Sequence, residues 1–453
     1  MNREINIKIK SRIKNRTGTA APPLILILFL ILISAARGDT NDAVHQIDLP
    51  TALRLAGAQN LDIQIAQERL AEAKANHQSA LAQFFPWIAP GISYRQHDNN
   101  IQNVQGDIVD VHKYSYAPGV ALATQVELGD AIYQSLASKQ VANAAGHGLE
   151  AQRQQSVLAA AQGYFDLALA QGTVTVAREA VRIAAGYEEQ VSRAVTAGIA
   201  FKGDALRAQV QKERNELTLR QTQEQQRIAA ARLAQTLRLD PAVVLTAQEA
   251  ELAPLNLITN RTLDSLVTQA LSSSPEFKQS TALAAAARDR KSGATYGPLI
   301  PSLGATAFFG GLGGGRDGVA DMFGGQQDYI VGASWRIGPG GLFDFTRIRA
   351  SDARLKITEL DNRKLQDELT RQVVEGFTRW QSQADQIQTA RQALAAAAEG
   401  FQLAQQRKEF AVGIVLETIQ AESDLTRAQL DYLKAVAGFN QAQYGLQRAL
   451  GGL

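Results

Sequence analysis

The sequence of 453 residues has no cysteine, few aromatic residues and almost no excess of either charge. Without cysteine the chain can form no disulfide bond, and no thiol is present to carry an N-terminal lipid. Aromatic residues make up only 6% of a chain that is 45% hydrophobic, so small and aliphatic side chains supply most of the apolar surface. That balance favours closely packed helices over a thick globular core. The formal net charge of +2 gives no electrostatic reason to expect a nucleic-acid partner.

Long hydrophobic runs are also missing. The one notable run, residues 24–33, has 10 residues, about half of the roughly 20 that a membrane-spanning helix needs. Basic residues precede it and small residues follow it, which is the layout of a secretory signal peptide. We therefore expect residues 1–38 to be a signal peptide, cleaved after Ala36 or Gly38. An uncleaved anchor is the alternative, and the shortness of the run argues against it.

Proline is absent from two long stretches, residues 131–195 and 345–412. Alanine and long polar side chains dominate both stretches, and these residues are good helix formers. Each stretch predicts a helix about 100 Å long at 1.5 Å per residue. Such helices do not fit inside the compact core of a globular domain.

One pattern occurs twice, with a displacement of about 215 residues. Each copy opens with an apolar-periodic helix (residues 51–84 in the first), breaks at proline, and continues through two β-like stretches, a long helix, a glycine and a shorter helix. We expect two structural repeats, residues 39–250 and 251–453, each with helices plus two strands. The predicted strands are residues 87–97, 114–127, 302–310 and 328–337. The glycines between 313 and 318 match a dinucleotide fingerprint by letters, but they lead toward a strand and predict a flexible surface loop.

The first long helix carries two apolar stripes with a spacing of seven residues. A two-residue offset corresponds to about 200° around a helix, so the stripes lie on nearly opposite sides. A helix with a neighbour on each side in a curved single layer needs this pattern, and it predicts the wall of a hollow helical cylinder. Four strands cannot close a barrel alone, but strands from several chains can. The stripes are Leu167, Val174 and Val181, and Leu169, Val176 and Ile183.

An ordered set of short motifs occurs in both copies. The second copy carries residues 410–414, 416–421 and 428–433, and the first carries residues 196–199 and 204–206. With this set the chain resembles the outer-membrane efflux (TolC-like) family over essentially everything after the signal peptide. The resemblance implies a mostly α-helical fold with a membrane β-barrel, formed by a homotrimer with four strands per protomer and twelve in all. It further implies localisation in the outer membrane with a periplasmic helical extension.

The resemblance also implies function. The protein is expected to be a passive exit duct, working with a periplasmic adaptor protein and an inner-membrane pump and embedded in outer-membrane lipid. It implies no enzyme activity and no cofactor. The cargo stays open between drugs, metals and proteins, and a protein-secretion duct is one form of the hypothesis. The alternative from another class is a secreted coiled-coil structural or adhesion protein.

Candidate site residues lie at the turns between the long and the shorter helices. The resemblance implies that Gly198, Ile199, Gly413 and Ile414 contact the adaptor, and the alternative for the apolar residues of these turns is that they close the tip against neighbouring helices. It implies a pore or gate role for Glu417, Asp204 and Gln420, since a ring of three carboxylates favours cations. The structural alternatives are that Asp204 caps the following helix and that Glu417 provides a favourable first-turn charge.

Aromatic residues near the strand ends are candidates for a membrane girdle, and packing between barrel and helices is the alternative. These candidates are Trp87, Tyr114, Phe308 and Trp335. The histidines have no metal-ligand spacing, and no nucleophile motif stands out, so we expect no catalytic, cofactor-binding or metal-binding residues.

Overall fold

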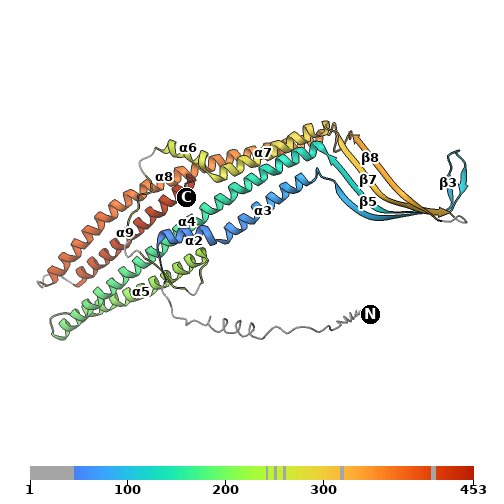
Figure 1. Cartoon of the computed structure of the whole chain (residues 1–453). Coiled ribbons are helices and arrows are strands. Elements are labelled where there is room, and N and C mark those ends of the chain that lie inside the picture. Colours follow the sequence, from blue (N-terminus) through green and yellow to red (C-terminus); the bar gives the residue numbers. More distant parts are fainter. Residues whose placement is uncertain (1–44, 241–242, 249–251, 259–261, 317–320, 410–414) are drawn as a thin grey trace, which may run out of the picture. The chain divides into compact units, whose positions relative to one another are not determined.

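A computed structural model describes residues 45–453 except 241–242, 249–251, 259–261, 317–320 and 410–414 (Figure 1). The predicted residues 1–38 signal peptide, Gly413 and Ile414 lie outside the described residues. The order of elements repeats: two helices, two long strands, a very long helix and a shorter helix occur twice. This order agrees with the duplication expected from the sequence.

The elements of the first half are α2 (Leu49–Gln59), α3 (Leu61–Ala82), β2 (Trp87–His97), β5 (Lys113–Glu127), α4 (Leu128–Thr196) and α5 (Lys202–Leu237). Those of the second half are α6 (Leu263–Ser273), α7 (Pro275–Tyr296), β7 (Ser302–Arg316), β8 (Met322–Ser334), α8 (Phe345–Glu409) and α9 (Val415–Ala449). The short elements are β1 (His45–Ile47), β3 (Asn100–Gln102), β4 (Ile108–Asp110), β6 (Leu245–Ala247) and the 3₁₀ turn Gly297–Leu299.

The prediction of one helix over residues 51–84 is wrong, because two helices meet at Asn60. Asn60 is extended (ψ 133°), and its side-chain oxygen accepts a hydrogen bond from the Asp62 backbone N–H, which caps α3. The second half breaks in the same place. There Ser274 precedes Pro275, which disfavours the helical conformation at Ser274, and the Ser274 hydroxyl accepts from the Phe277 N–H.

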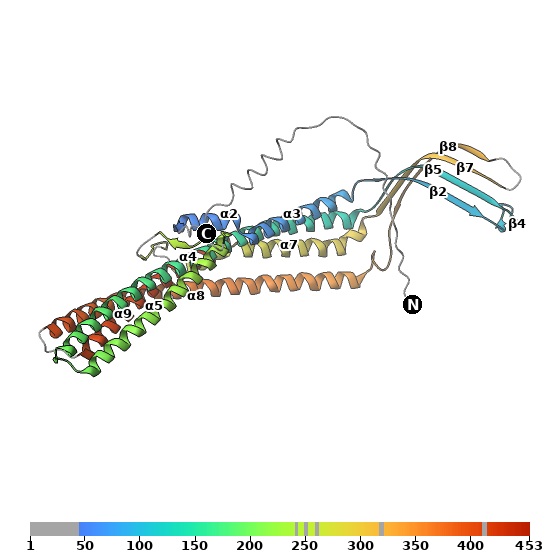
Figure 2. The same cartoon turned by 90° about the horizontal axis from the view of Figure 1, so that it is seen from below.

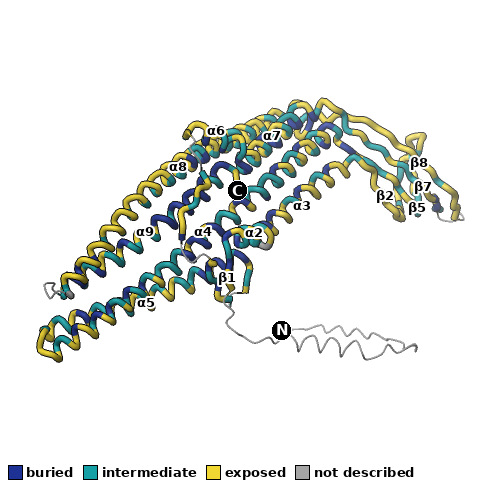
Figure 3. The backbone as a smooth tube through the Cα atoms, turned by 60° about the vertical axis from the view of Figure 1, so that its left-hand side comes forward, coloured by how far each residue is buried: buried dark blue, intermediate teal, exposed yellow. Residues whose placement is uncertain are grey.

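The long helix α4 has neighbours on both sides, as its two stripes predict. Its first part packs against α3 and α7, and its later part against α5 and α9 (Figures 1 and 2). The core lies mainly where α4 meets α5 and α9, around the buried residues Tyr164, Phe165 and Leu233 (Figure 3). Leu167 and Val174 of one stripe are buried there, whereas residues of the other stripe are half-buried.

Part of the connection between the two halves, residues 253–257, lies along α9. The backbone of this segment at Ala253, Leu255 and Leu257 exchanges hydrogen bonds with the amide side chains of Asn440 and Gln443. Both amides are almost fully buried. They replace the strand partner that an extended segment otherwise lacks, so the segment is fixed to the helix without being part of a sheet.

The four long strands form one antiparallel sheet in the order β2-β5-β7-β8. The register is constant along each pair, so successive side chains alternate between two faces. One face, which we call the apolar face, is rich in large exposed apolar side chains. The other, which we call the polar face, carries mostly small and polar side chains. The apolar face includes Ile88, Ile92, Tyr94, Val120, Leu122, Phe309, Tyr329 and Val331, and the polar face includes Ser93, Arg95, Ser115, Ala121, Gln125, Thr306 and Asp328.

The second-half strands are longer at their far ends than the sequence predicts. Gly313 and Gly315 belong to β7 rather than to a surface loop, so the loop prediction is wrong for them. Glycine has no side chain to show the two-residue alternation, but it lets a neighbouring ring cover the strand. A Cβ at Gly313 would lie 2.3 Å from Cζ of Tyr116, whose ring is stacked on Phe323.

Candidate functional site

The turn between α4 and α5 is a glycine-terminated helix end. Gly198 has φ +75°, a conformation that glycine adopts without strain, and the Ile199 N–H donates to the Ala194 carbonyl. Just beyond it, the side chains of Ile199 and Phe201 are 84% and 82% exposed. The turn therefore presents two large apolar groups to solvent, and the described part of the chain does not cover them.

The matching turn between α8 and α9 is described only at its flanks, since Gly413 and Ile414 lie outside the described residues. Glu417 is in the first turn of α9, and its Oε1 is 3.0 Å from Nη1 of Arg407 near the end of α8. This ion pair links the two helices of the hairpin. Glu417 therefore occupies the position expected if it serves as a favourable negative charge in the first turn of the helix, which is the structural alternative to a pore role.

Asp204 does not cap α5, because the N-cap position is Phe201 and no side chain caps it. Asp204 lies in the first turn, and its Oδ1 is 3.3 Å from Arg207 Nη1. Gln420 is exposed and donates to Asp424 one turn further along. Each of the three pore candidates thus has a local partner, and their role in a pore stays a prediction.

Contacts between the two hairpins involve Tyr187 of α4. Its hydroxyl donates to the Val415 carbonyl at 3.1 Å, and Lys408 Nζ lies 3.8 Å from the centre of its ring. The same ammonium donates to Gln190 at 2.6 Å. Burial raises the pKa of Tyr187. These bonds join the end of α8 and the start of α9 to the last turns of α4.

The sequence analysis missed Glu422, which is 4% exposed. Its carboxylate accepts hydrogen bonds from the amides of Gln211 and Asn215 on α5 and from the Thr426 hydroxyl. Among the described residues no cation pairs with it, and burial raises its pKa. Its spacing of four from the buried Thr418 was the only signal in the sequence, because its amide partners lie more than 200 residues away.

Glu422 and Tyr187 line a cavity of about 440 Å³ between the hairpins, together with Arg182, Lys408 and Phe401. Both a carboxylate and two cations therefore reach one space between the hairpins.

The girdle candidates divide between the faces of the sheet. Tyr114 lies on the apolar face, and Trp335 directly follows β8 with the parity of that face. Trp87 pairs with Ala123 and Phe308 with Ala121, so both lie on the polar face. The girdle role stays a prediction, and the register favours Tyr114 and Trp335 for it.

In the part of the chain that the structure describes, no group of three or more His, Asp or Glu side chains could hold a metal ion. No described helix combines the length and the apolar character that crossing a membrane requires.

Comparison with known proteins gives a family match over part of the chain and a fold for most of it. The sequence profile of the outer membrane efflux protein family matches residues 266–452. None of the curated proteins gives a match. The structure is similar to three solved proteins. The outer membrane channel CmeC of Campylobacter jejuni has a TM-score of 0.75 and 15% identity, and the match covers 89% of this chain and 85% of that one. The outer membrane protein VceC of Vibrio cholerae has a TM-score of 0.74 and 17% identity, with 89% of this chain and 96% of that one covered. The outer membrane channel MtrE of Neisseria gonorrhoeae, in its open state, has a TM-score of 0.71 and 15% identity, with 89% of each chain covered. The predicted fold class is confirmed.

The buried carboxylate makes the contact between α5 and α9 dependent on pH. A raised folded-state pKa means that the native state holds the proton more tightly than the unfolded chain, so stability is greatest below the unfolded pKa and falls as pH rises through the folded one. Glu422→Gln should therefore raise the thermal midpoint of helix loss by a few degrees at pH 8 and leave it almost unchanged at pH 4. Circular dichroism at both values measures this.

The matched control is Asp424→Asn, because Asp424 is an exposed carboxylate two residues away. Asp424→Asn should leave the thermal midpoint of helix loss unchanged at both pH 8 and pH 4. An equal shift in the two variants at pH 8 would mean that surface charge, rather than burial of Glu422, sets the dependence.

Proposed function

We propose that the chain is a member of the outer membrane efflux protein family, whose profile matches residues 266–452, and that three copies of it form a passive exit duct through the outer membrane. Solutes would enter from a periplasmic adaptor and an inner-membrane pump, which supplies the energy. No bond-breaking chemistry is assigned to the chain. The alternative of a secreted coiled-coil protein does not account for the long exposed apolar sheet face.

The observation that carries the proposal is the pair of open sheet edges beside the apolar face. The outer edges of β2 and β8 have no strand partner among the described residues. Unpaired backbone groups are not tolerated in hydrocarbon, so a sheet in lipid must close on itself. Strand direction alternates across the sheet, so β8 of one copy can pair antiparallel with β2 of the next. Three copies would close a barrel of twelve strands, an even number as in other outer-membrane barrels.

The helices support a hollow extension of that barrel. In each copy α3, α4, α7 and α8 lie side by side in this order. A layer of this kind has two free edges, at α3 and α8, just as the sheet has at β2 and β8. The same neighbour that closes the sheet would therefore close the helical layer and leave a water-filled interior.

The two helical turns are proposed as the pump-facing end. The exposed Ile199, with Gly198, Gly413 and Ile414, would provide the surface for the adaptor. Glu417, Asp204 and Gln420 are proposed to line the narrowest part of the pore. The ion pair between Glu417 and Arg407 would hold the two helices of the α8–α9 hairpin together at the turn.

The first prediction concerns assembly. Mass measurement of the protein in mild detergent should give three chains, because two free edges per chain close only in a ring. Single channels formed by that species in a planar bilayer should conduct ions. A stable monomer with the same conductance would contradict the proposal.

The second prediction concerns the lipid-facing surface. Val331 and Ile330 are neighbours on β8, 83% and 68% exposed, on opposite faces of the sheet. Val331→Arg should reduce the amount of trimer in the outer membrane, because an arginine on the lipid face of a barrel is destabilising, by up to about 2–4 kcal/mol at the bilayer midplane. Ile330→Arg, which would face water, should keep most of it. Membrane fractionation measures both, and equal losses would refute the assignment of faces.

The third prediction concerns the adaptor surface. Replacing Ile199 and Phe201 by Asp should abolish efflux, because a charge pressed into an apolar contact costs several kcal/mol. Trimer level should not change, since both side chains are exposed in the protomer. Leu217→Asp is the control, an exposed apolar residue further along α5. Loss of the trimer in the double variant would show that these residues close the tip by packing.

A further inference from the structure

The end of the sheet that is remote from the helices, its far end, carries three cations on the polar face. Lys113 of β5 lies directly opposite Arg316 of β7, and Arg95 of β2 lies opposite Ser115, two residues along β5 from Lys113. Directly opposite residues on neighbouring strands have Cβ atoms about 5 Å apart, and residues two apart on one strand point to the same face. All three side chains are exposed. We call Arg95, Lys113 and Arg316 the basic row.

The charge of the basic row is not neutralised on the polar face. Cations directly opposite each other destabilise a sheet, and within the part of the chain that the structure describes no acid pairs with any of the three. The nearest acid on this face of the four strands is Asp328, in register with Phe308 and Ala121, eight residues along β5 from Lys113. Eight residues span roughly 26 Å, well beyond the Debye length of about 10 Å at 0.1 M salt.

The described acids at the far end lie away from the polar face. Asp321 accepts a hydrogen bond from the Tyr114 hydroxyl at 2.6 Å, and Tyr114 belongs to the apolar face. Asp98 accepts from Gln96, which is paired with Tyr114 and so shares that face. The remaining acids belong to the β3–β4 hairpin, which continues beyond the end of the sheet (Figure 1). Cations and acids are therefore separated between the two sides of the strand ends.

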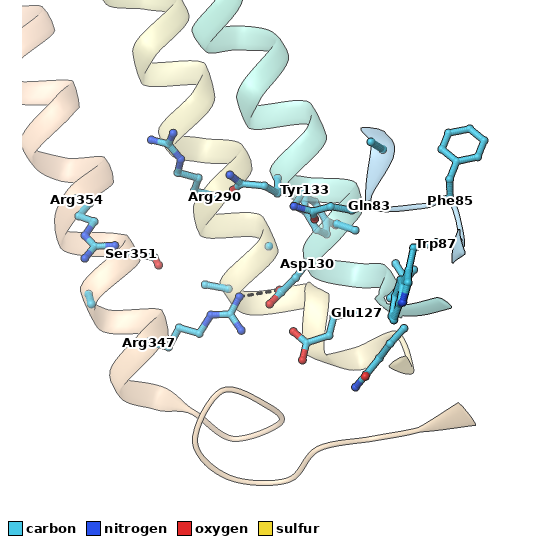
Figure 4. A pocket seen from close by; sticks show the side chains of 18 residues that line it. Gln83, Phe85, Trp87, Glu127, Asp130, Tyr133, Arg290, Arg347, Ser351 and Arg354 are labelled. Atoms are coloured by element: carbon cyan, nitrogen blue, oxygen red, sulfur yellow. Dashed lines mark hydrogen bonds and ion pairs between the residues drawn. The ribbon is translucent and has the colours of Figure 1, made fainter. Parts of the chain in front are cut away.

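Charges near the helices are arranged differently. Glu127, at the end of β5, lies 3.5 Å from Arg336, which follows β8. Asp130 of α4 and Arg347 of α8 are 2.7 Å apart, and Figure 4 shows their side chains pointing toward each other. Each of these pairs links a segment of the first half of the chain to one of the second half. The charges there thus have a structural role, whereas the basic row makes no such link.

We propose that the basic row forms an anion-binding ring just inside the outer mouth of the duct, where it concentrates anionic solutes. The inference rests on the proposed function, which turns the polar face toward the interior and puts the far end of the sheet at the cell surface. Three copies would bring three basic rows to one level of the barrel. Rings of Arg and Lys favour anions in pores, and guanidinium groups bind phosphate and carboxylate through paired N–H donors.

The test is block of single-channel current by inositol hexakisphosphate, a compact polyanion. Trimers added to one side of a planar bilayer should insert sheet first, because the polar helices cannot cross hydrocarbon. The outer mouth then faces the opposite compartment. In dilute salt the polyanion should block from that compartment at a concentration about tenfold lower than from the helix side, because a basic ring raises the local concentration of anions. Block should largely disappear at 1 M salt, where the Debye length is about 3 Å.

The variant Arg95→Gln, Lys113→Gln, Arg316→Gln should raise the blocking concentration at the outer mouth about tenfold, because it removes the field that concentrates the polyanion. Lys113→Gln alone removes one charge of the three and should raise it about twofold. The single variant provides the measurement if the triple variant assembles poorly.

The matched control is Arg214→Gln, Arg220→Gln, Arg227→Gln, which removes the same number of exposed cations from α5. It should leave the blocking concentration at the outer mouth unchanged. An equal rise in the two triple variants would mean that net charge rather than the basic row attracts the polyanion. That result, equal block from the two sides in wild type, or unchanged block in the basic-row variants would overturn the inference.

Current in the absence of polyanion tests the duct separately. Channels that conduct but show no side-specific block would refute the ring and leave the exit duct intact. Trimers that conduct no ions would refute the duct, and calorimetric titration of the same trimers in lipid nanodiscs with inositol hexakisphosphate then tests the ring. Tighter binding by wild type than by the basic-row variant would support the ring, and equal binding would refute it.

Discussion

The constraint on which the rest of this structure depends is the need of every backbone N–H and C=O for a partner. A helix meets it within itself, but a four-stranded sheet leaves two rows of groups unpaired. Here those rows lie at β2 and β8, on a sheet whose apolar face is also left uncovered by the described residues. Water could satisfy the edges but not the apolar face, and lipid could satisfy the face but not the edges. The proposed closure with further copies would satisfy both, and would account for a sheet that is incomplete in one chain.

The same requirement is met locally by side chains wherever regular structure stops. Asn60 and Ser274 cap the helices that begin beside them. At the start of α8, Asp344 accepts from the N–H groups of Gly340 and Arg347 and from the Thr346 hydroxyl, and these bonds lower its pKa to about 2. In the connection between the halves, the side chains of Asn440 and Gln443 accept hydrogen bonds from the backbone N–H groups of Leu255 and Leu257. Polar side chains at the points where regular structure stops thus pair the backbone N–H and C=O groups there. Long helices and strands can then follow one another with few buried backbone groups left unpaired.

The sequence predicts the elements whose side chains carry a period. The strand from Trp87 to His97 is predicted to the residue, because Pro86 directly precedes it and its partner strand alternates clearly. The break at Asn60 is missed, because asparagine resembles the polar residues around it until its capping bond is seen. The end of β7 is missed because glycines have no side chain to alternate. Glu422 could not be predicted, since its burial depends on amides supplied by α5 more than 200 residues earlier in the chain.

The helical turns and the junction between the helices and the sheet differ in how their charged side chains are paired. At the turns, the carboxylates of Glu417 and Asp204 each have an arginine close by, so their fields are partly cancelled while the hairpins keep this arrangement. At the junction with the sheet, Arg290 and Arg354 have no such partner among the described residues, and the acids near them are engaged elsewhere. Coulomb interactions are strongest for charges that are not already neutralised at short range. Electrostatic selection of solutes is therefore expected to depend more on the junction than on the turns as long as the hairpins stay in this conformation.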